Sequence, residues 1–106
     1  MRILYERPPL WDLINAKFHV AGYPILFAWG GRIYNPEGVK VPRELHAHEE
    51  VHGARQDAYL AGLPPEQQAK FDVEDSVFAW WHTYIESPAF RLAEEIPAHR
   101  AEYLSF

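Results

Sequence analysis

The chain has 106 residues, a formal net charge of −5 with neutral histidines, and no cysteine. This length predicts a single domain, residues 1–106, and the lack of cysteine excludes disulfides, cysteine-based zinc fingers and thiol nucleophiles. The negative charge and the scattered basic residues argue against nucleic-acid binding. The longest mostly apolar run, Val20 to Trp29, is too short to span a bilayer, and residues 1–9 lack the apolar core of a secretory signal. We therefore expect a soluble, cytoplasmic protein without a membrane or nucleic-acid partner.

The first part of the chain predicts one helix and one hairpin. Apolar residues at helical spacing predict a short amphipathic helix over residues 11–18. Residues 25–29 and 32–34 predict paired strands, joined at Gly30-Gly31 by a two-residue turn that accepts positive φ at both positions. A further turn is expected over residues 35–38, followed by a few extended residues.

The second part of the chain predicts three helices. The first runs from Pro42, whose fixed φ suits a helix start, to about Leu60. The second is rich in aromatic residues and covers residues 66–85. The third follows the start signal Ser87-Pro88, covers residues 88–104, and should be kinked by Pro97. Helices around a small hairpin predict an α+β fold, mostly α.

The most informative stretch is His48-Glu49-Glu50-Val51-His52, which reads H-E-x-x-H. Within the predicted helix, His48 and His52 lie one turn apart on one face, with Cβ atoms roughly 5–6 Å apart. Two imidazoles in this position suit one Zn²⁺ at about 2.0–2.1 Å from each. Glu49 follows the first histidine directly, and its carboxylate is placed to take a proton from a metal-bound water.

A catalytic zinc site usually has three protein ligands and a water, so a third ligand is needed. The motif H-E-x-x-H-x-x-G-x-x-H is excluded, because Arg55 and Ala58 stand where it requires glycine and histidine. The remaining candidates are acidic or histidine side chains that follow the motif: Glu74, Glu86, Glu94, Glu95, Glu102, His82 and His99. Helical periodicity does not choose between the adjacent Glu94 and Glu95.

At this point the sequence resembles the gluzincin metallopeptidases, and by its length the single-domain minigluzincins. In that family the third ligand is a glutamate in an E-x-x-A or E-x-x-D pattern on a later helix, and Glu95-Ile96-Pro97-Ala98 matches E-x-x-A. The resemblance covers most of the chain and implies one Zn²⁺ bound by His48, His52 and Glu95. Small phage and bacterial proteins in which a glutamine closely follows H-E-x-x-H are also similar, since Gln56 follows His52 here.

The resulting hypothesis is a zinc metallopeptidase that acts on a peptide or protein substrate. Glu49 serves as general base and then as general acid, and a further donor stabilises the oxyanion. The candidates for that donor are His82, Tyr84, His99 and Tyr103. The strand at residues 25–29, or its return, is expected to offer an edge to which an extended substrate could add as a strand.

Several residues have simpler interpretations. His46 and His19 are expected at the surface or in structural roles, and the aromatic stripe Phe78, Trp81 and Tyr84 is expected in the core. Gln56 is expected either beside the ligands or in solvent. Arg55 or Arg100 could orient a ligand carboxylate, and the default expectation for both is a surface role. Two alternative functions remain: a non-catalytic zinc-binding protein, destabilised by chelation, and a metal-free protein-interaction module.

Overall fold

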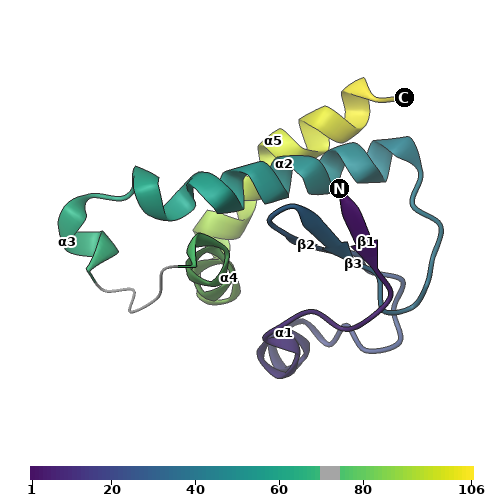
Figure 1. Ribbon diagram of the computed structural model, residues 1–106, viewed down its shortest axis with the longest axis horizontal. Coiled ribbons are helices and arrows are strands. Elements are labelled where there is room, and N and C mark those ends of the chain that lie inside the picture. Colours follow the sequence, from purple (N-terminus) through teal and green to yellow (C-terminus); the bar gives the residue numbers. More distant parts are fainter. Residues whose placement is uncertain (70–74) are drawn as a thin grey trace.

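The chain adopts an α+β fold, mostly α, in which a long helix, α2, lies across a small sheet and the helix α4 (Figure 1). The structure is a computed structural model that describes residues 1–69 and 75–106. Its elements in chain order are β1 (Arg2–Leu4), α1 (Trp11–Phe18), β2 (Phe27–Trp29), β3 (Arg32–Tyr34), α2 (Arg43–Tyr59), a 3₁₀ turn (Leu60–Gly62), α3 (Pro65–Gln68), α4 (Ser76–Glu86) and α5 (Pro88–Leu104). None of the helices within the described ranges is long and apolar enough to cross a membrane.

The sheet contains the predicted hairpin and one strand that was not predicted. Its order is β1-β3-β2, with β2 antiparallel and β1 parallel to β3. The strand β2 begins at Phe27 and is shorter than expected. In the turn, Gly30 has a φ of 60°, whereas Gly31 is not among the residues with positive φ. Positive φ at the first central position alone is the pattern of a type II′ turn, so the predicted two-residue turn is confirmed and only its first glycine uses a positive φ.

The predicted turn after β3 is confirmed, and Asn35 holds it together. The Asn35 side chain accepts a hydrogen bond from the Val39 backbone N–H at 3.0 Å and donates one to the Val39 carbonyl at 2.8 Å. Gly38 adopts a φ of 65° within this turn. The next few residues form no strand with the sheet, and they lead directly to α2.

The helix α1 and the two long helices agree with the sequence, but the aromatic segment does not. Pro42 is the residue before the first turn of α2, and Ser87 accepts a hydrogen bond from the Phe90 N–H at the start of α5. A continuous helix over residues 66–85 is wrong, since α3 ends at Gln68 and α4 begins at Ser76. The side chain of Asp75 caps α4 by accepting from two backbone N–H groups, a start signal that the prediction overlooked.

The buried face of α2 is polar. Three of its buried residues, His48, His52 and Gln56, follow one another at intervals of four, where an ordinary core-facing helix would carry apolar side chains. The fourth is Gly53, where a Cβ atom would lie 2.1 Å from the Gly30 carbonyl oxygen. The turn between β2 and β3 packs directly against this glycine, at a distance that leaves no room for a side chain.

An aromatic cluster joins the sheet to α4. Trp29 stacks on Trp81 with ring centroids 5.5 Å apart, and Trp80 stacks on Tyr84 at 4.7 Å. The buried core around them comprises Ile14, Val20, Phe27, Trp29, Tyr34, Val77, Trp80 and Trp81. The core membership expected for Phe78, Trp81 and Tyr84 is confirmed, although Phe78 and Tyr84 are only partly buried. This cluster contacts the polar face of α2 at His52, whose ring centroid lies 5.5 Å from that of Trp80.

Candidate metal centre

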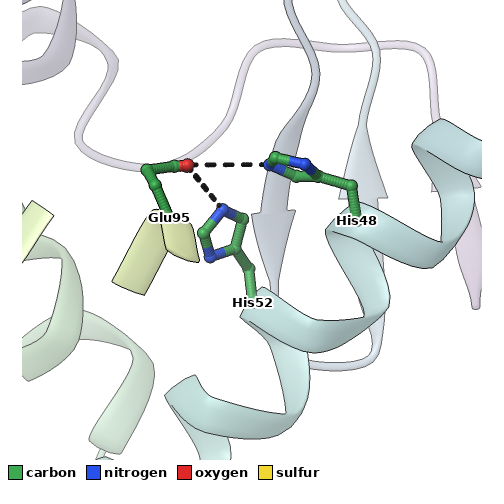
Figure 2. Close-up of side chains that lie close together, drawn as sticks. All are labelled: His48, His52 and Glu95. Carbon is green, nitrogen blue, oxygen red and sulfur yellow. Dashed lines mark hydrogen bonds and ion pairs between the residues drawn. The ribbon is translucent and has the colours of Figure 1, made fainter. Parts of the chain in front are cut away.

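Two histidines from α2 and one glutamate from α5 converge on a common point (Figure 2). The Glu95 carboxylate lies 2.7 Å from His52 Nε2 through one oxygen and 3.6 Å from His48 Nε2 through the other. One ligand atom from each of the three residues lies within 4.8 Å of the other two. Two imidazole nitrogens and a carboxylate oxygen are a donor set that divalent metals, and zinc in particular, take up in proteins. The structure thus has a His/Glu group that could hold a metal ion.

A second carboxylate fixes the orientation of His48. His48 Nδ1 lies 2.7 Å from Glu102 Oε1. An ionised carboxylate only accepts hydrogen bonds, so Nδ1 carries a proton, and Nε2, which faces Glu95, is the nitrogen that could bind a metal once it is deprotonated. Such a carboxylate behind a ligating histidine is common in metal sites. The corresponding Nδ1 of His52 is buried and has no hydrogen-bond partner among the described residues.

The adjacent glutamates Glu94 and Glu95 point to different neighbours. Glu94 is 5% exposed and accepts hydrogen bonds from the Arg55 guanidinium at 2.7 and 3.0 Å and from Trp80 Nε1 at 2.7 Å. These bonds tie α5 to α2 and α4. Glu94 therefore belongs to a structural network. Arg55 lies at the surface as expected, and its guanidinium pairs with this buried carboxylate.

The charges of the site favour an ionised Glu95. Burial alone would raise the pKa of Glu95, but hydrogen bonds from His48 and His52 outweigh burial and bring that pKa well below its usual range. Burial lowers the pKa of His48, whereas the hydrogen bond to Glu95 and the negative charges of Glu49 and Glu95 raise it, and the net shift is upward. Glu95 thus carries a negative charge, which favours a cation at this group.

The pKa of Glu49 is shifted in the opposite direction, upward. Burial raises the pKa of its carboxyl group to about 8, the neighbouring Glu95 charge adds to this shift, and His48 and a hydrogen bond from the Ala28 backbone oppose it. Glu49 and the three residues of the candidate metal group line the same cavity, which has a volume of about 460 Å³. A carboxyl group with this pKa exchanges protons near neutral pH.

Two of the four candidates for an oxyanion donor line the cavity that holds the metal group. Tyr84 and His99 line the cavity, and neither His82 nor Tyr103 is among the described residues that do. The Tyr84 hydroxyl lies 3.4 Å from Glu95 Oε1, and burial together with the Glu95 charge raises the pKa of Tyr84, so the hydroxyl stays protonated. The His99 ring lies against His48 with centroids 4.6 Å apart.

The other candidates lie away from this group or outside the described residues. Glu74, like Phe71, lies outside the described residues. Glu86 is exposed. It is in neither of the two His/Glu groups found among the described residues, which are His48, His52 and Glu95, and His48, His99 and Glu102. His46 pairs with Glu50 on the outer side of α2, and His19 is exposed at the end of α1. Both histidines thus agree with their expected surface or structural roles.

Glu102 and Gln56 have roles that the sequence did not reveal. The spacing of residues 95, 99 and 102 places all three on one helical face, and this signal could have identified Glu102 as a partner of the site. Gln56 is fully buried, which excludes the solvent-exposed alternative. Its amide binds the backbone of β2, donating to the Ala28 carbonyl and accepting from the Gly30 N–H.

Comparisons with known proteins give no independent assignment: no family model, curated protein or solved structure matches this chain.

Proposed function

We propose that this protein is a zinc-dependent peptidase of the gluzincin type, with His48, His52 and Glu95 as metal ligands. The observation that carries the proposal is the convergence of these three side chains from two helices, with Glu49 on the same cavity wall. Zinc in a site of this kind supplies a Lewis acid and a water whose pKa is lowered to about 7. Metal-ligating histidines with a carboxylate partner, as His48 has in Glu102, support the same assignment.

The residues around the metal group have different roles in the proposed reaction. Glu49 accepts a proton from the attacking water and passes it to the leaving amine, which requires a carboxyl group that exchanges protons near neutral pH. Tyr84 stays protonated and donates a hydrogen bond to the oxygen of the attacked carbonyl group. The aromatic residues beneath the site exclude water from one side of the cavity, and this strengthens these electrostatic interactions.

The proposal is tested with the whole chain, first stripped of metal and then supplied with Zn²⁺. A mixture of synthetic peptides is incubated with each form, and new termini are detected by mass spectrometry. We expect cleavage in the zinc-supplied sample, its loss on chelation, and its return when zinc is restored. Cleavage that persists unchanged in the chelated sample would contradict the assignment.

Replacing Glu102 with Gln should weaken zinc binding without removing any ligand. The amide retains the size of the carboxylate but lacks its charge, and the loss of such a partner typically costs about 10–100-fold in metal affinity. Competition with a chromophoric chelator measures the change. Glu50→Gln is the matched control, since Glu50 is an exposed acidic residue of α2 paired with His46. Equal affinities in the two variants would show that Glu102 does not support the site.

A further inference from the structure

The edge of β2 that faces α2 is already occupied by side chains of the protein itself. The Ala28 carbonyl accepts hydrogen bonds from Gln56 Nε2 and Trp81 Nε1, both at 3.0 Å. The Ala28 backbone also hydrogen-bonds the Glu49 carboxylate, and the Gly30 N–H donates to Gln56 Oε1 at 2.7 Å. The Gln56 amide thus pairs with the strand edge as another strand would.

The other residues of this strand also have backbone partners. Phe27 and Trp29 pair with β3, and in an antiparallel ladder the residue between two such pairs directs its own groups to the opposite edge. That residue is Ala28, and both of its groups have partners. An extended substrate therefore could not add to this strand at Ala28 without displacing these side chains, because strand addition requires free N–H and C=O groups.

The cavity beside the candidate metal group offers apolar surface in place of a strand edge. It is lined by the core residues Ile14, Phe27 and Trp81, which are at most 6% exposed. Phe18 at the end of α1 and Ile25 and Leu26 ahead of β2 line it with more exposed surface. No lysine or arginine is among the described residues that line it. Its volume of about 460 Å³ is within the range of about 300–1,000 Å³ that small-molecule sites occupy.

We infer that the site takes a short peptide or amide, which is held by one large apolar side chain in this cavity, and does not take an extended polypeptide aligned along β2. The inference rests on the proposed function for the choice of an amide as ligand. Affinity then comes from burial of a single side chain, so residues further along the substrate contribute little. The cavity wall formed by Phe18 selects the size of that side chain.

Binding is measured on the metal-free protein, so that the result does not depend on catalysis. The whole chain is titrated in the presence of chelator and followed by protein-detected NMR. The probes are N-acetyl-L-phenylalaninamide and a longer Ser/Thr-rich peptide amide that carries one phenylalanine. We expect dissociation constants that agree within about threefold. Tighter binding of the longer peptide by more than about tenfold, or no binding of either probe at the cavity, would overturn the inference.

Two variants of α1 test the cavity wall itself. Phe18→Ala should weaken binding of N-acetyl-L-phenylalaninamide by about tenfold, as expected for the loss of part of an apolar contact surface. Leu13→Ala is the matched control, because Leu13 is 48% exposed on the same helix and does not line the cavity. In the enlarged cavity of the Phe18 variant, N-acetyl-L-tryptophanamide should bind more tightly than the phenylalanine probe. Equal losses in both variants, or no gain for the larger probe, would contradict the assigned wall.

If the probes bind as expected but zinc-dependent cleavage is absent, the proposed function fails and the assignment of the cavity stands. If cleavage is observed but the longer peptide binds much more tightly, the proposed function stands and this inference fails.

Discussion

Replacing Glu49 with Gln should leave zinc binding intact and lower the rate of peptide hydrolysis by about 10²–10⁴-fold, the usual contribution of a general acid–base group. Glu49 lines the cavity beside the ligand group but is not a member of that group, so the amide should not disturb the metal. The glutamine side chain has the size of glutamate, but it cannot accept and return a proton. Single-turnover assays with a peptide cleaved by the wild type would measure the loss.

The control for this experiment is Glu50→Gln, one residue further along α2. Glu50 is exposed and pairs with His46, so hydrolysis by this variant should match that of the wild type. Zinc content must be measured on the same samples, because a Glu49 variant without metal would lose activity for another reason. Full activity in a zinc-loaded Glu49→Gln protein would disprove the role of Glu49.

Replacing Glu94 with Ala should destabilise the fold more than replacement of any exposed glutamate. The buried Trp80 N–H would lose its acceptor, and an unsatisfied buried donor costs about 1–3 kcal/mol. Arg55 would add little, because its side chain is 47% exposed and water can replace the lost partner. For a domain of this size such a loss corresponds to a fall in Tm of roughly 5–15 °C, measurable by circular dichroism.

Two further variants serve as controls for the Glu94→Ala experiment. Glu86→Ala removes an exposed glutamate at the end of α4 and should leave Tm nearly unchanged. Glu94→Gln retains an oxygen that can accept from Trp80 and should recover part of the loss. If the alanine variant melted with the wild type, the network of Arg55, Glu94 and Trp80 would not be what joins α5 to α2 and α4.

Much of the fold could be predicted because local signals agreed with the tertiary structure. The Gly30-Gly31 turn, the start of α2 at Pro42 and the Ser87-Pro88 start of α5 all depend on backbone preferences of single residues. The strand β1 could not be predicted from such signals. It pairs in parallel with β3, from which it is separated by α1 and β2, and pairing at this distance leaves no short-range pattern.

The candidate site was predictable only in part, for a related reason. The spacing of His48 and His52 fixes their common face through helix geometry alone. The choice between Glu94 and Glu95 depends on how α5 packs against α2 and α4, and helical periodicity does not specify that contact. The apolar residues of α5 do not mark its buried face either, since Ile96 and Tyr103 are exposed while Glu94 is buried.

Zinc content per folded chain, measured after dialysis, tests the central claim most directly. The samples are the wild type, Glu95→Ala and Glu94→Gln, each supplied with zinc before dialysis and checked for folding by circular dichroism. We expect one zinc per chain in the wild type and in Glu94→Gln, and loss of the metal in the folded Glu95→Ala protein. A wild type that retains no zinc, or a Glu95 variant that retains it as well as the wild type, would contradict a metal centre formed by His48, His52 and Glu95.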